Sequence, residues 1–145
     1  MKSVNLKSNY IFLGILALLV LSITSACSRK ANFQTSSVEP AARGSVKVKK
    51  DKNHNHQISI SLLNLAEPER LQTPKKVYVV WMITDENMTK NLGQIHMGTK
   101  LFSKTLKGSF TTQSSFKPVK IFVTAEDEAD IQYPGMFVVL STDNF

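Results

Sequence analysis

The sequence has a single cysteine, Cys27, among its 145 residues. One cysteine excludes an intrachain disulfide. The chain also lacks the patterns of common catalytic sites, because no serine lies in a G-x-S-x-G elbow and no glycine-rich loop is suited to cradle a phosphate. We therefore expect a protein that is not an enzyme and that needs no cofactor.

An apolar run long enough to cross a bilayer is missing as well. The N-terminal run covers residues 10–21, which span only about 18 Å of a hydrocarbon layer roughly 30 Å thick. Lys2 and Lys7 precede this run, and small residues follow it up to Ala26. This three-part pattern predicts a secretory signal peptide over residues 1–26 and a mature protein outside the cytoplasm.

The end of this segment resembles a bacterial lipoprotein leader, whose lipobox is an aliphatic residue, two small residues and a cysteine. Ser25, Ala26 and Cys27 match it, whereas Thr24 departs from the usual leucine and Ile23 is displaced by one position. The resemblance implies cleavage between Ala26 and Cys27, with a thioether-linked diacylglycerol and a further acyl chain on Cys27. Two or more acyl chains give a lasting membrane anchor.

Ordinary signal cleavage is the alternative, because Thr24-Ser25-Ala26 also satisfies the small-x-small rule. It would leave a free thiol on Cys27, a liability in an oxidising compartment that lipidation removes. Ser28 stands where enteric-type lipoproteins carry the aspartate of inner-membrane retention. The leader therefore favours the outer membrane if the cell has one.

The charge balance is moderately basic, with 18 Lys and Arg against 11 Asp and Glu. Without Lys2 and Lys7, 16 basic and 11 acidic residues remain. Such an excess favours an anionic lipid surface beside an anchor, at about 1 kcal/mol for each nearby Lys or Arg. Nucleic acid is not expected as a partner, because stacking aromatic residues do not interleave with the basic ones.

Residues 27–43 are predicted to comprise the lipidated cysteine and a flexible tether. Residues 28–42 are polar and show neither a period of two nor a period of 3.6. Phe33 is their only aromatic residue, and we expect it to be incidental. The folded domain is then predicted to cover residues 44–145.

Short alternating segments fill that domain, with turn signals about every ten residues. Residues 77–84 are apolar on both faces, which predicts a central strand with Trp81 in the core between two layers. The pattern as a whole predicts an all-β, antiparallel, immunoglobulin-like β-sandwich of about seven strands. The predicted strands are residues 46–49, 58–62, 77–84, 92–95, 100–106, 119–125 and 136–142, with 110–112 pairing briefly.

The second half of the chain resembles the extracytoplasmic domain of anti-sigma-K factors. The matching segments are Tyr78-Val79-Val80-Trp81-Met82-Ile83, Leu92-Gly93-Gln94-Ile95, Ile121-Phe122-Val123-Thr124-Ala125-Glu126, Pro134-Gly135 and Val138-Val139-Leu140. The resemblance implies a β-sandwich on the outer side of a membrane. Residues 127–133 replace the paired glycines of that family, and only a short leader precedes Cys27. We therefore expect a stand-alone version of the outer domain, without a cytoplasmic sigma-binding half.

Two residue clusters are candidate sites. His54 and His56 alternate at the start of a predicted strand, and His96 is the third histidine of the chain. Together they are a candidate transition-metal site, although no carboxylate or thiol lies at a convincing ligand spacing. The other cluster is an acidic run that predicts either a solvated loop or an interaction loop, without the spacing of a calcium loop. Its residues are Glu126, Asp127, Glu128 and Asp130.

The sequence thus favours a lipid-anchored, non-catalytic β-sandwich that binds or scaffolds another cell-envelope component, with the membrane and an unidentified envelope protein as partners. The alternative is a small periplasmic metal- or ligand-binding protein that uses His54, His56 and His96. Loss of bound metal after replacement of His54 and His56 would support the alternative.

Overall fold

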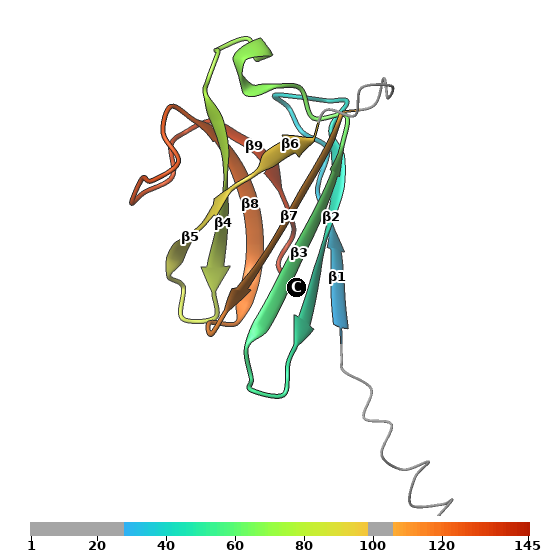
Figure 1. The fold of residues 1–145 in the computed structure, drawn as a ribbon, viewed down its shortest axis with the longest axis vertical. Coiled ribbons are helices and arrows are strands. Elements are labelled where there is room, and N and C mark those ends of the chain that lie inside the picture. The colour runs from blue at the N-terminus through green and yellow to red at the C-terminus, as the bar shows by residue number, and fades with distance from the viewer. Residues whose placement is uncertain (1–27, 99–105) are drawn as a thin grey trace, which may run out of the picture.

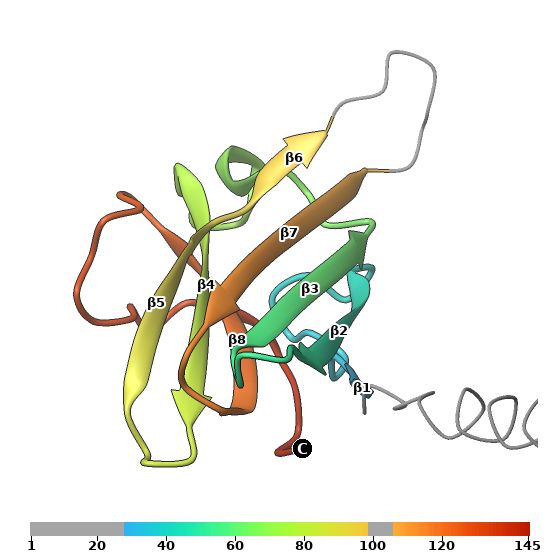
Figure 2. The ribbon, with the colours of Figure 1, turned by 60° about the horizontal axis from the view of Figure 1, so that its bottom comes forward.

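A computed structural model describes residues 28–98 and 106–145 and shows two antiparallel β-sheets packed face to face (Figures 1 and 2). The first sheet has five strands in the order β1-β2-β3-β7-β6, and the second has four in the order β5-β4-β8-β9. The first-sheet strands are β1 (Ser28–Asn32), β2 (Arg43–Lys50), β3 (His56–Leu63), β6 (His96–Gly98) and β7 (Lys107–Ser114). The second-sheet strands are β4 (Val77–Thr84), β5 (Thr89–Gln94), β8 (Pro118–Glu126) and β9 (Val138–Ser141).

The strand order is that of an immunoglobulin-like sandwich. β2, β3, β7 and β6 follow the A-B-E-D order, while β4, β8 and β9 follow C-F-G with β5 added beside C. The predicted fold class is therefore confirmed. The described residues hold nine strands rather than about seven, because β1 and the short β6 lack the alternation that marks a strand in sequence.

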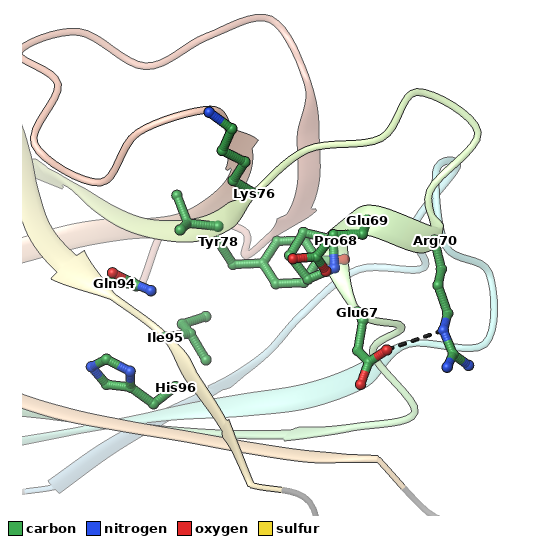
Figure 3. Close-up of a pocket in the computed structure, with 10 residues that line it drawn as sticks. Glu67, Pro68, Glu69, Arg70, Lys76, Tyr78, Gln94, Ile95 and His96 are labelled. Carbon is green, nitrogen blue, oxygen red and sulfur yellow. Dashed lines mark ion pairs between the residues drawn. The ribbon is translucent and has the colours of Figure 1, made fainter.

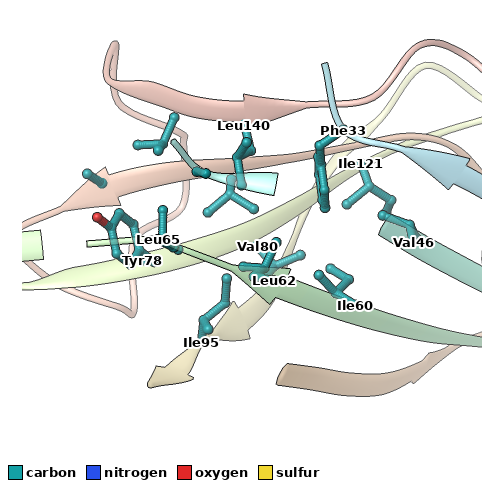
Figure 4. Close-up of a cluster of buried hydrophobic side chains, with 14 of the residues drawn as sticks. Phe33, Val46, Ile60, Leu62, Leu65, Tyr78, Val80, Ile95, Ile121 and Leu140 are labelled. Atoms are coloured by element: carbon teal, nitrogen blue, oxygen red, sulfur yellow. The ribbon is translucent and has the colours of Figure 1, made fainter. Parts of the chain in front are cut away.

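The core lies between the sheets and is formed by alternate residues of their inner faces. In β3, Ile58, Ile60 and Leu62 are buried while Gln57 and Ser61 are exposed, as a strand with one wet face requires. Figure 4 shows Leu62 beside Val80 of the opposite sheet, and Ile60 and Ile121 belong to the same buried cluster. This apolar contact between the sheets is the main source of their stability.

Trp81 does not lie in this core, contrary to the prediction. Tyr78, Val80 and Met82 enter the cluster between the sheets, whereas Trp81, although fully buried, does not belong to it. Successive side chains of a strand point to opposite faces, so Trp81 lies on the outer face of the four-stranded sheet. The sequence marked β4 as apolar on both faces, but it did not show which face meets the other sheet.

The predicted tether is also wrong over residues 28–43. β1 pairs with β2 along its whole length, from Ser28 opposite Lys49 to Asn32 opposite Ser45. Phe33 then enters the core and forms a β-bridge with Thr142. β1 is an edge strand that is mostly exposed on both faces, so it carries no alternating pattern. Backbone pairing and the buried Phe33 hold it in the sandwich, so the folded domain already includes Ser28 and does not start at residue 44.

Several strand boundaries differ from the prediction. β5 starts at Thr89 rather than at residue 92, and β7 extends from Lys107 to Ser114 rather than over 110–112. Most of the predicted strand 100–106 lies outside the described residues. Helical structure is limited, among the described residues, to a single 3-10 turn, η1 (Pro68–Arg70). None of the described helices is long and apolar enough to cross a membrane.

Candidate functional site

The most distinctive surface of the molecule is built on the β8–β9 loop, residues 127–137. This loop lies against the outer face of the four-stranded sheet, where Trp81, Thr124 and Glu126 are buried. The side-chain amide of Asn91 on β5 donates hydrogen bonds to the carbonyl oxygens of Ala129 and Ile131, both at 3.0 Å. In the register of the sheet, Asn91 lies opposite Trp81. The loop therefore follows a defined path beside the tryptophan.

Beneath the loop, Trp81 is held by two contacts with β8. Its indole N–H donates a 2.8 Å hydrogen bond to the hydroxyl of Thr124. Its ring stacks on Phe122 with 6.3 Å between the ring centroids. A buried indole needs a hydrogen-bond partner, and Thr124 supplies it. The pair gives the outer face a rigid base.

The two ends of the β8–β9 loop are fixed by charged side chains. Glu126 accepts a 2.7 Å hydrogen bond from the N–H of Gly135, and a Cβ at position 135 would lie 2.6 Å from the Glu126 carboxylate. A side chain at position 135 would therefore push the Glu126 carboxylate aside and disturb this hydrogen bond. Lys75 forms a 2.7 Å ion pair with Asp127, and its ammonium group lies 5.2 Å from the centroid of the Phe137 ring. The loop is thus tied to the sheet at both ends.

This ordered loop exposes large apolar side chains. Met136 is 95% exposed and Tyr133 is 75% exposed, and Phe137 and Val138 beside them are about 40% exposed. A cluster of exposed apolar residues on a fixed loop is typical of a protein interaction surface. The sequence pattern does not indicate this surface, because residues 136–142 are predicted to form a strand. The proline-glycine pair beside tyrosine, methionine and phenylalanine was the available signal.

The predicted acidic interaction run divides into two parts. Asp127, Glu128 and Asp130 are exposed on the β8–β9 loop, in agreement with a solvated or interacting segment. Glu126 is the last residue of β8 and is buried, and its carboxylate accepts the Gly135 N–H. Glu126 is therefore a residue that positions the loop, and its assignment to an exposed contact set was wrong.

A second candidate is an open hollow of about 540 Å³ between η1 and the adjoining ends of β4, β5 and β6 (Figure 3). Arg70 pairs with Glu67 at 3.0 Å at its rim. The Tyr78 hydroxyl donates to the carbonyl oxygen of Ala66, and burial raises the pKa of this phenol above its ordinary value. The side chains of Glu67, Arg70 and Tyr78 thus already bond with groups of the same fold. Their arrangement does not point to a particular reaction.

The three histidines are not brought together as a metal site. His54 lies in the β2–β3 turn with a positive φ of 66°, so it does not continue the alternation of β3, which begins at His56. His96 pairs with Ser109, which lies opposite Ser61 on β3. His96 is therefore level with Ser61 along the sheet. Ser61 lies five residues from His56 on β3, so the two histidines are about 17 Å apart along the strand direction. Within the described part of the chain, no group of three metal-ligating side chains was found.

Cys27 and Ala26 lie outside the described residues, so the lipid anchor and the cleavage site stay predictions. Comparison of the chain with protein-family models, with curated proteins and with solved structures gives no match. The resemblance to the outer domain of anti-sigma-K factors likewise stays a prediction.

Proposed function

We propose that this protein is an extracytoplasmic lipoprotein, anchored through Cys27, whose β-sandwich binds another cell-envelope protein without catalysing a reaction. The observation that carries the proposal is the exposed apolar set on the β8–β9 loop. Tyr133, Met136 and Phe137 would lose their contact with water on binding, and tyrosine is among the residues that most often dominate interface energies. The leader sequence supports the location, and the fixed path of the loop supports binding with little ordering cost.

The anchor is tested by replacing Cys27→Ser and following the incorporation of labelled fatty acid in growing cells. We expect the wild-type protein to carry label and to fractionate with membranes, and the variant to lose the label. A wild-type protein without label would contradict the anchor.

The binding surface is tested by placing a photo-crosslinking residue at position 136 in cells and identifying the crosslinked protein by mass spectrometry. Binding of that protein, once purified, should weaken about tenfold or more for Tyr133→Ser with Met136→Ser, since central interface residues cost more than 1 kcal/mol each. Leu63→Ser is the matched control, because Leu63 is 44% exposed but lies on β3. Equal binding by the loop variant and the wild type would refute the assigned surface.

A further inference from the structure

One end of the sandwich gathers exposed lysines. β1 begins there at Ser28, which lies opposite Lys49. The β2–β3, β4–β5 and β7–β8 turns lie at the same end, at the bottom of Figure 1. Lys50, Lys52 and Lys117 are exposed on or beside these turns. We call this surface the lysine end and define it by Lys49, Lys50, Lys52, Lys90, Phe116 and Lys117.

Positive charge prevails at the lysine end although acidic residues are present. Asp51, Asp85 and Glu86 lie in its turns, and the Asp51 carboxylate accepts hydrogen bonds from the backbone N–H groups of Asn53 and Asn55. The neighbouring edge of β1 and β2 adds further exposed basic side chains, which are Arg29, Lys30 and Lys47.

The opposite end of the sandwich carries both ends of the β8–β9 loop, together with exposed basic residues such as Lys76 and Lys107. β8 runs away from the lysine end to Glu126, so the β8–β9 loop starts with Asp127 at the far end (Figure 1). The middle of the loop returns along the outer face of the four-stranded sheet to Asn91, whose side chain donates to Ala129 and Ile131. Asp127 at the start of the loop, and Met136 beside the Gly135 that binds Glu126, therefore lie away from the lysine end.

An aromatic side chain lies among the lysines. Phe116, in the β7–β8 turn, is 37% exposed, and the ammonium group of Lys90 lies 4.9 Å from its ring centroid. A half-exposed apolar ring beside lysines is suited to a lipid headgroup region, where the ring enters the interface and the ammonium groups meet phosphates.

We propose that the lysine end rests on an anionic lipid surface and fixes the orientation of the domain, with the exposed Met136 of the β8–β9 loop directed away from the membrane. The proposal rests on the proposed anchor, because Cys27 precedes Ser28 by one peptide bond and consecutive Cα atoms are about 3.8 Å apart. Since salt screens charges over about 8 Å, a domain held this close lies within the field of charged headgroups. The absence of a tether over residues 28–43 makes this close approach obligatory.

The test uses the full lipoprotein, purified from membranes and reconstituted into phosphatidylcholine vesicles with or without phosphatidylglycerol. An environment-sensitive fluorophore is attached to an introduced cysteine in Ser115→Cys, beside Phe116, or in Met136→Cys on the β8–β9 loop. We expect a blue shift at position 115 that requires phosphatidylglycerol and reverses at high salt, and no shift at position 136.

Charge variants separate a local effect from a general one. Lys50→Gln with Lys52→Gln should abolish the shift at position 115. Lys76→Gln with Lys107→Gln removes the same charge from exposed positions outside the lysine end and should preserve the shift. Equal signals in neutral and anionic vesicles, or equal loss in both double variants, would overturn the proposal.

The mass of the purified protein distinguishes failure of the anchor from failure of the surface. If Cys27 carries no lipid, the anchor is refuted, and cosedimentation of the free protein with the same vesicles then tests the lysine end alone. Binding should weaken about fivefold for each lysine removed at that end. Cosedimentation that is insensitive to Lys50→Gln with Lys52→Gln refutes the surface.

Discussion

At the scale of single residues, His56 is expected to make the stability of the fold depend on pH. Its ring atom Nδ1 is buried and has no hydrogen-bond partner within the described structure. Burial lowers the pKa of His56 from 6.5, and Lys50 and Lys117 lower it further, although Asp85 and Asp51 act in the opposite direction. The folded state therefore disfavours the protonated ring.

This lowered pKa predicts that stability falls as the pH falls. Above the unfolded pKa of 6.5, the ring is neutral in both states, and below it the unfolded chain takes up the proton more readily. The free energy of unfolding should thus decrease between about pH 7 and pH 5. Urea unfolding at each pH measures it, and His56→Gln should reduce this slope more than His96→Gln does. An equal slope in the two variants would contradict the role of His56.

The buried indole of Trp81 predicts a specific cost for losing its acceptor. Thr124→Val keeps the shape of the side chain but leaves the Trp81 N–H unpaired, which should lower the free energy of unfolding by about 1–3 kcal/mol. Thr111→Val, at an exposed position of β7, is the control and should change it by less than about 0.5 kcal/mol. Fluorescence of the single tryptophan reports unfolding in both variants. Similar losses in the two would show that the hydrogen bond is not what stabilises this site.

At the scale of elements, β1 and Phe33 decide where the domain begins. If the segment were a tether, truncating Phe33 would have no effect on folding. Phe33 is only 8% exposed, so Phe33→Ala should cost about 3 kcal/mol in the free energy of unfolding. Phe116→Ala, which truncates a ring that is 37% exposed, should cost clearly less. Chemical denaturation measures the free energy of unfolding of both variants. If Phe33→Ala lowers it no more than Phe116→Ala does, the segment is a tether after all.

At the scale of the whole molecule, we propose that different parts of the sandwich contact the membrane and the partner protein. The lysine end would face lipid beside the anchor, and the β8–β9 loop would present Tyr133 and Met136 to a partner at the far end. An immunoglobulin-like sandwich suits this division, because its strands run between the two ends and its loops gather there. The sheets act as a rigid spacer, and the loops carry the residues that bind lipid and partner.

The sequence by itself determined the all-β class and the central position of β4, because alternation with a period of two is a local signal that burial on one face imposes. It did not reveal β1, whose pairing with β2 satisfies backbone groups and leaves no pattern in the side chains. Only the tertiary structure decided that Trp81 faces outward, that Glu126 supports a loop, and that His96 lies far from His56. Each of these depends on which distant strand lies beside the residue, and no local pattern encodes that neighbour.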